Sequence, residues 1–248
     1  MRLIILAACL IAPATWAQNG SSAPGMTADN LHYVAGRGIT LYRDAERTEP
    51  YIRLKFREPV VVMNTYPDRY RVYTQDGARG YVRTEDISNL WILVSKRKKQ
   101  LYLYRGQQLV LQFNADFGYN VYSDKVRRGS EADRDHWRTP EGVFYVVHKN
   151  PRSQYYRAFL LNYPNAEDAT RGLRTGLISE QEFEAIMDAE RQNRTPPMGT
   201  RLGGMIEIHG DGTGLSTNWT QGCVAVRNED MDRLWGIVRE GTPVVIQK

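Results

Sequence analysis

The sequence predicts a mostly β protein of the α+β class, arranged as two units with few helices. Short runs rich in Val, Ile, Tyr and Thr, separated by Gly, Asn and Asp, recur along the chain, and such runs are typical of strands. Only residues 180–191 and 229–239 show the apolar period of an amphipathic helix. With 248 residues the chain is long enough for one or two domains.

The N-terminus has the features of a secretory signal peptide. Arg2 precedes an apolar run over residues 3–14, and Ala17 is a small residue suited to cleavage. The run is shorter than the roughly 20 residues of a membrane-spanning helix. We therefore expect residues 1–17 to direct export to the periplasm or another extracytoplasmic compartment, with no stable membrane insertion after cleavage. Cleavage before Cys9, as in a lipoprotein, is the alternative.

The overall charge indicates a weak preference for acidic surroundings. The formal net charge is +5, which suits a polyanionic neighbour such as a cell wall or membrane surface. The sequence has no basic cluster with interleaved aromatic residues, no zinc-ligand spacing and no phosphate-binding glycine loop. We therefore expect no nucleic-acid partner, no metal and no cofactor.

Residues 31–90 predict a small β-barrel. Residues 18–30, rich in Ser, Gly, Ala and Asn, precede it as a predicted flexible linker. Four short β runs follow, at residues 39–42, 59–63, 70–74 and 80–82, and a Gln-Asp-Gly turn separates the last two. This order, ending in "RGYVRTEDI", resembles bacterial SH3-like domains. The resemblance implies a binding or positioning module, and a structural appendage without a ligand is equally consistent.

Residues 91–248 predict a β-rich unit with two or more helices. A β-meander is expected over residues 92–113, a proline-led turn at 139–142 introduces a strand over 143–147, and further strands are expected at 205–209 and 243–246. Asn228 is the predicted N-cap of the helix over 229–239. We interpret the long segment between residues 147 and 205 as a lid or wall over the site.

The residues that indicate chemistry are His209 and Cys223, which are 14 positions apart. His209 ends an apolar strand, and Cys223 follows Gly222, where the backbone can bend. If Cys9 leaves with the signal peptide, Cys223 is the one thiol of the mature chain, and a neighbouring imidazole can activate it. The carbonyl of Gly210 can orient the imidazole, and the N–H groups of Gly222 and Cys223 can hold an oxyanion. A buried inert cysteine and a structural histidine are the alternatives.

The order of these residues resembles the L,D-transpeptidase catalytic domain, also called the YkuD domain. The resemblance rests on the "IHG" strand end, the Ser/Thr-x-Gly-Cys turn and the upstream "RTPEGVFYV", and it covers nearly all of residues 91–248. It implies that Cys223 attacks a peptidoglycan stem tetrapeptide, that D-alanine leaves, and that the thioester passes to an amine or to water. It assigns the remaining positions of the site to Thr220, Gln221, Gly222 and Asn228.

Two positions depart from the family pattern. Gln221 stands where a histidine is common, and Ala225 stands where an arginine is common. Arg227 lies two residues further on and shares the strand face of Ala225 if the segment stays extended. We expect Arg227 either to bind a carboxylate of the stem peptide or to pair with Glu229 or Asp230.

The sequence leaves three functions open. The first is an L,D-transpeptidase that makes cross-links or attaches a protein to the wall. The second is a hydrolase of the same fold, either an L,D-carboxypeptidase or an amidase that releases a wall-attached protein. The third is a peptidoglycan-binding protein without catalysis, which the pairing of His209 with Cys223 disfavours.

Overall fold

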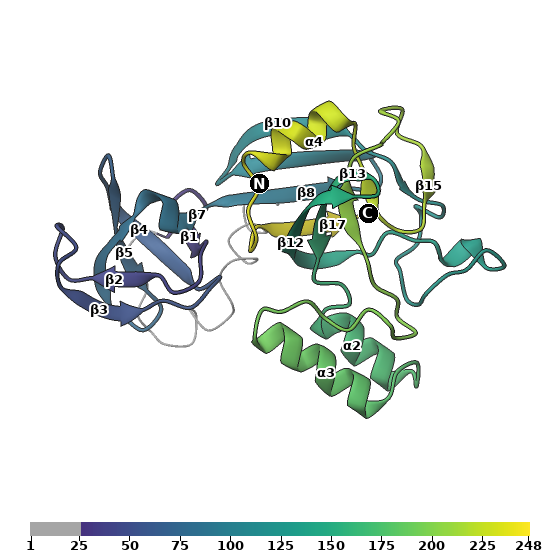
Figure 1. Ribbon diagram of the computed structural model, residues 1–248, viewed down its shortest axis with the longest axis horizontal. Coiled ribbons are helices and arrows are strands. Elements are labelled where there is room, and N and C mark those ends of the chain that lie inside the picture. The colour runs from purple at the N-terminus through teal and green to yellow at the C-terminus, as the bar shows by residue number, and fades with distance from the viewer. Residues whose placement is uncertain (1–25) are drawn as a thin grey trace. The chain divides into compact units, whose positions relative to one another are not determined.

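A computed structural model describes residues 26–248. The predicted signal peptide, the alternative cleavage at Cys9 and most of the predicted linker lie outside these residues. The chain divides into two compact units: the first runs to Trp91 and includes residues 104–110, and the second comprises residues 92–103 and 111–248 (Figure 1). No helix in the described part is long and apolar enough to cross a membrane.

Residues 26–30, the end of the predicted linker, form a turn. The Thr27 N–H donates to Asn30 Oδ1 at 2.7 Å, and the Asn30 N–H donates to Thr27 Oγ1 at 3.3 Å. Ala28 within the turn is buried. Side-chain hydrogen bonds therefore satisfy part of the backbone of this segment, and its role as a flexible linker stays a prediction.

The first unit is a seven-stranded antiparallel sheet in the order β3-β2-β6-β5-β4-β1-β7. Its strands are β1 (Leu31–Val34), β2 (Thr40–Tyr42), β3 (Pro50–Arg53), β4 (Pro59–Thr65), β5 (Arg69–Thr74), β6 (Arg79–Arg83) and β7 (Ile87–Ser88). The four predicted β runs are confirmed, whereas β1, β3 and β7 were not predicted. The core consists of Val34, Leu41, Leu54, Val60, Val72, Val82 and Ile87.

The second unit is built on an eight-stranded mixed sheet in the order β10-β9-β8-β17-β12-β13-β14-β16 (Figure 1). Its strands are β8 (Leu90–Ser95), β9 (Gln100–Arg105), β10 (Gln108–Asn114), β12 (Gly142–Ser153), β13 (Tyr156–Leu161), β14 (Glu207–His209), β16 (Val224–Ala225) and β17 (Pro243–Gln247). A second, two-stranded sheet pairs β11 (Phe117–Gly118) with β15 (Asn218–Thr220). The predicted meander and the strand at 243–246 are confirmed. The strand predicted at 205–209 begins only at Glu207, because Met205 has a φ of 55°.

Two helices, α2 (Ala166–Arg174) and α3 (Glu180–Arg191), pack side by side (Figure 1). The helix predicted over 180–191 is confirmed, and Ser179 caps it. Helix α2 was not predicted, although Asn165 and Asp168 form a capping box at its start. The two helices enclose a small apolar cluster of Ala169, Ile178, Ile186 and Leu202.

Helix α4 (Asn228–Trp235) packs against the large sheet. Its Trp235 ring stacks on Phe159 of β13 at 5.4 Å between centroids. The predicted bounds are wrong at both ends. Arg227 is the N-cap residue, because Asn228 uses its side chain elsewhere, as described below. The helix ends at Trp235, with Gly236 as its C-cap.

Candidate active site

His209 and Cys223 come together because two parallel strands lie side by side. In β14 and β16, Ile208 faces Val224 and His209 faces Ala225. Cys223 immediately precedes β16, which places it beside Glu207 at the start of β14. Since side chains alternate along a strand, Glu207 and His209 point to the same side.

These side chains line one cavity of about 430 Å³. The β12–β13 turn supplies Gln154 and Tyr155, and the loop after β11 supplies Glu131, Arg134 and Trp137. Thr220 ends β15, and Gln221 lies in the turn that follows. The segment between residues 147 and 205 was predicted to wall the site. Its first part does so through the β12–β13 turn, whereas α2 and α3 contribute no residue to the cavity lining.

The imidazole of His209 is held in one orientation by its own backbone. Its Nδ1 lies 2.7 Å from the carbonyl oxygen of Gly210. A carbonyl can only accept, so Nδ1 carries the proton and Nε2 keeps a lone pair. Burial lowers the pKa of His209, although the hydrogen bond to Gly210 acts in the opposite direction. The ring is therefore neutral at pH 7 and able to accept a proton.

Two aromatic side chains confine the ring of His209. Tyr155 stacks on it with 4.5 Å between centroids and 24° between planes. Trp219 meets it edge-on at 6.1 Å and 72°. These contacts bury the imidazole, whose residue is 1% exposed, and they limit its rotation.

Asp116 anchors the loop that carries Trp219. Its carboxylate accepts hydrogen bonds from the Trp219 indole N–H at 2.9 Å, the Thr217 N–H at 2.8 Å, and the N–H and hydroxyl of Thr213 at 2.6 and 2.9 Å. Burial by itself raises the pKa of Asp116, but these donors outweigh burial and hold it below its usual value. The side chain is therefore a buried carboxylate whose charge is satisfied by hydrogen bonds.

The turn before Cys223 requires glycine. Gly222 has a φ of 133°, and a Cβ there would lie 2.6 Å from the carbonyl oxygen of Arg138. Thr220 stabilises the turn, because its hydroxyl donates to the Cys223 carbonyl at 2.7 Å and accepts from the Gly222 N–H at 3.2 Å. In this structure the Gly222 N–H donates within the turn, and its role as an oxyanion donor stays a prediction.

The thiol of Cys223 is half-buried and protonated at rest. Its Sγ lies 3.3 Å from the carbonyl oxygen of Met205. Burial raises the pKa of the thiol to about 12, although the Glu207 N–H and the Lys125 ammonium act in the opposite direction. Thiol and imidazole are therefore both neutral before substrate binds, and a proton must move between them for the sulfur to attack.

Arg227 and Asn228 lie outside the cavity lining. Arg227 Nε donates to Asp230 Oδ2 at 3.1 Å. Of the two expectations for Arg227 the structure therefore favours the ion pair. Asn228 accepts from the Asp211 N–H at 2.7 Å and donates back to Asp211 at 3.0 Å. It thus fixes the loop after His209 instead of capping α4.

Sequence reasoning missed Asp116, Tyr155, Glu207 and Lys125. Contacts between segments that are far apart in the sequence leave no local pattern, so the sequence offered no signal for Asp116, Tyr155 or Lys125. Glu207 could have been found, because it lies two residues before His209 on the same strand. No group of three or more His, Cys, Asp or Glu that could hold a metal occurs within residues 26–248.

Comparison with known proteins identifies the family to which the chain belongs. The L,D-transpeptidase catalytic domain (YkuD) family matches residues 89–246. The chain therefore belongs to the L,D-transpeptidase catalytic domain family, whose members act on peptidoglycan peptides. No curated protein shows significant sequence similarity to it.

Several solved structures are similar to the chain. Bd1075 of Bdellovibrio bacteriovorus is 27% identical, with a TM-score of 0.40, and the match covers 66% of this chain and 49% of that one. An L,D-transpeptidase from Xylanimonas cellulosilytica is 19% identical over 64% of this chain and 61% of that one, with a TM-score of 0.40. One from Mycobacterium smegmatis is 12% identical over 93% and 88%, with a TM-score of 0.37. This chain thus matches about half the length of Bd1075.

Proposed function

We propose that this protein is an exported cysteine L,D-transpeptidase that acts on peptidoglycan stem tetrapeptides through a thioester on Cys223. The observation that carries the proposal is the cavity shared by Cys223 and an oriented, neutral His209. Membership of the family supplies the peptidoglycan substrate class. Export follows from the signal-like N-terminus of the sequence.

The proposed reaction has two halves. His209 Nε2 takes the thiol proton as Cys223 Sγ attacks the carbonyl of the third stem residue, and the Cys223 N–H holds the oxyanion. Collapse of this intermediate breaks the amide bond, and His209 returns the proton to the departing amine of D-alanine. An acceptor amine then attacks the thioester, His209 takes its proton, and the thiol is restored with a new amide bond.

Water in place of the amine gives the alternative, a hydrolase that trims the tetrapeptide or releases a wall-attached protein. Both functions share the first half-reaction and differ only in the acceptor. The rings of Tyr155 and Trp219 cover part of the imidazole of His209 and support transfer over hydrolysis, because they shield that part of the base from water.

Incubation with purified muropeptides, followed by mass spectrometry, tests the proposal. The wild-type protein should release D-alanine and form cross-linked dimers, and Cys223→Ala should form neither while keeping its circular dichroism spectrum. Tripeptide without dimers would favour the carboxypeptidase. Product formation by Cys223→Ala would exclude the thioester mechanism.

The first unit is proposed to position the enzyme on the wall, as its resemblance to SH3-like domains implies. Exposed Tyr51 and Tyr66 are suitable contacts for a saccharide or peptide, since each is an aromatic ring at the surface with an arginine guanidinium stacked over it. Replacing both with Ala should reduce sedimentation with insoluble wall sacculi. Unchanged sedimentation would favour the structural appendage.

A further inference from the structure

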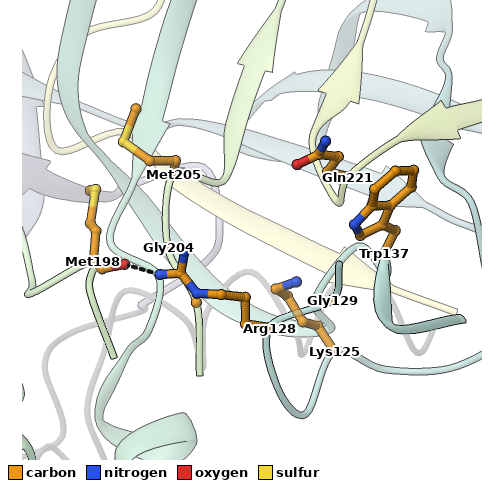
Figure 2. A pocket seen from close by; sticks show the side chains of 9 residues that line it. Lys125, Arg128, Gly129, Trp137, Met198, Gly204, Met205 and Gln221 are labelled. Carbon is orange, nitrogen blue, oxygen red and sulfur yellow. Dashed lines mark hydrogen bonds between the residues drawn. The ribbon is translucent and has the colours of Figure 1, made fainter. Parts of the chain in front are cut away.

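A second cavity, of about 280 Å³, adjoins the first beside Cys223. The two cavities share Trp137, Met205 and Gln221 in their linings. The second is otherwise lined by Lys125, Arg128, Met198 and three glycines. Figure 2 shows the side chains of Lys125, Arg128, Trp137 and Gln221 arranged around one space.

Glycines let the walls of this cavity approach each other. A Cβ on Gly129 would lie 2.6 Å from the indole of Trp137, and one on Gly204 would lie 2.5 Å from Met198. Gly203 has a φ of 97°, and a Cβ there would lie 3.4 Å from Cε of Lys125. The cavity therefore depends on backbone positions that larger residues cannot occupy.

Lys125 is a buried cation without a carboxylate partner in the described part of the chain. It is 3% exposed, and its ammonium nitrogen lies 3.5 Å from the carbonyl oxygen of His136, which is long for a hydrogen bond. Arg128 likewise meets a carbonyl, that of Met198, at 2.6 Å (Figure 2). Burying a charge is costly unless an opposite charge compensates it.

The other basic residues of the same loop are paired. Arg127 pairs with Asp133, Arg134 with Glu131, and Arg138 with Asp135. Of the five Lys and Arg residues between positions 119 and 139, only the two that line the cavity, Lys125 and Arg128, lack an acidic partner within residues 26–248. Two positive charges of this loop are therefore available to a negatively charged group that enters the cavity.

We infer that this cavity is a subsite for a carboxylate of the acyl donor, held by Lys125 and Arg128 next to the scissile bond. The inference deepens the proposed function. A residue that leaves from the end of a peptide carries its free carboxylate one residue beyond the attacked carbonyl, and this separation matches two adjoining cavities. The subsite would make the enzyme select donors with a free terminus over bonds within a longer chain.

Gln221 connects the two cavities. It lines both and lies two residues before the nucleophile. As a neutral amide it can donate to a carboxylate or to the peptide without adding a charge that would compete with Lys125. A donor lying across Gln221 would thus place its scissile carbonyl at Cys223 and its terminus at Lys125.

The first test measures binding without turnover. Calorimetric titration of Cys223→Ala compares a stem tetrapeptide that ends in D-alanine with the same tetrapeptide as its C-terminal amide. We expect the free acid to bind roughly 10- to 100-fold more tightly, as a charged hydrogen bond allows, and Lys125→Met in the same background to abolish the difference. Equal binding of acid and amide by the parent protein would overturn the subsite.

The second test uses turnover by the full chain. Three stem tetrapeptides are compared: the free acid, the C-terminal amide, and a peptide amidated only at the side-chain carboxylate of the third residue. Loss of turnover with the C-terminal amide identifies the terminal carboxylate as the ligand. Loss of turnover with the side-chain amide identifies the side-chain carboxylate instead. Absence of turnover with every peptide would contradict the proposed function and leave the binding result to judge the subsite.

Matched variants separate the subsite from the general charge of the loop. Arg128→Gln changes an exposed residue, so it provides a test even if Lys125→Met fails to fold. We expect Arg128→Gln to reduce the preference for the free acid severalfold. Arg127→Gln removes a charge from the same loop, but one already paired with Asp133, and should keep the full preference. Equal preference in the wild type, Lys125→Met and Arg128→Gln would exclude the subsite.

Discussion

The carboxylate of Asp116 accepts the indole N–H of Trp219 at 2.9 Å, and the ring of Trp219 in turn lies edge-on against His209. A residue 93 positions before the base in the sequence thus sets the shape of its surroundings. Asp116 does not contact the nucleophile or the base. It acts by holding the 213–219 loop.

We predict that Asp116→Asn weakens both the fold and the activity. An amide offers one acceptor oxygen in place of two and turns an N–H toward existing donors. Loss of these charge-assisted bonds should reduce the free energy of unfolding by about 1–3 kcal/mol, and kcat/KM should fall as Trp219 moves. Urea unfolding and steady-state kinetics measure the two effects. Thr213→Val, which removes one of the four hydrogen bonds to Asp116, should lose less stability and less activity than Asp116→Asn. Wild-type stability and kcat/KM in Asp116→Asn would disprove the role of this anchor.

The protonation states of Cys223 and His209 predict how thiol reactivity depends on pH. Burial raises the pKa of Cys223 to about 12 and lowers that of His209. Without substrate, alkylation by iodoacetamide at pH 7 should therefore be slow, because the thiolate is scarce. His209 must be neutral to act as base, so kcat/KM should stay level from about pH 6.5 upward and decline only at lower pH. Fast alkylation persisting near pH 5 would indicate a preformed thiolate–imidazolium pair instead.

Gly210→Ala should reduce turnover without removing any catalytic side chain. A Cβ at this position would collide with Asn228 Oδ1 and lie 2.9 Å from the Cβ of Tyr156. The backbone must shift, and the carbonyl that orients His209 shifts with it, so we expect kcat to fall by roughly tenfold to a hundredfold. Gly199→Ala is the control, because its Cβ would meet no atom within 4 Å. Equal kcat for the two variants would refute the positioning role of Gly210.

Arg227 is expected to contribute little to catalysis. Its side chain is 55% exposed and is paired with Asp230, and an exposed ion pair contributes about 0.2–1 kcal/mol to stability. Arg227→Ala and Arg227→Lys should both keep kcat/KM within about twofold of the wild type. A loss of tenfold or more in Arg227→Lys would return this residue to the substrate site.

The carboxylate subsite predicts a pH-dependent preference among donors. Burial lowers the pKa of Lys125 to about 8; the nearby Arg128 and Arg138 also lower it, and Cys223 and Asp168 raise it. Since only the protonated amine binds a carboxylate, KM for the free-acid donor should rise as pH increases through about 8. KM for the C-terminal amide should not follow this rise. Parallel pH profiles for the two donors would contradict charge recognition by Lys125.

Local patterns in the sequence determined several turns and one helix of the fold, including the turn that carries the nucleophile. The hairpin turn at Gly77, the helix over 180–191 and the Gly222–Cys223 turn each depend on residues within a few positions of one another. Turn chemistry, helix capping and apolar periodicity act over that range, so a linear reading can find them. The acceptor for His209 was predictable for the same reason, because Gly210 is its neighbour in the chain.

Only the tertiary structure decided what surrounds the two reacting residues. Tyr155 reaches His209 across 54 positions and Asp116 reaches Trp219 across 103, and packing of the sheets sets both contacts. From the sequence, Arg227 could have faced either a ligand or Asp230. The turn into α4 places its side chain against Asp230. Lys125 became significant because folding paired Arg127, Arg134 and Arg138 with acids, whereas within residues 26–248 no acid pairs with Lys125, which lines the cavity adjoining that of Cys223. Such partners are chosen by distances between segments remote in sequence, which no local pattern encodes.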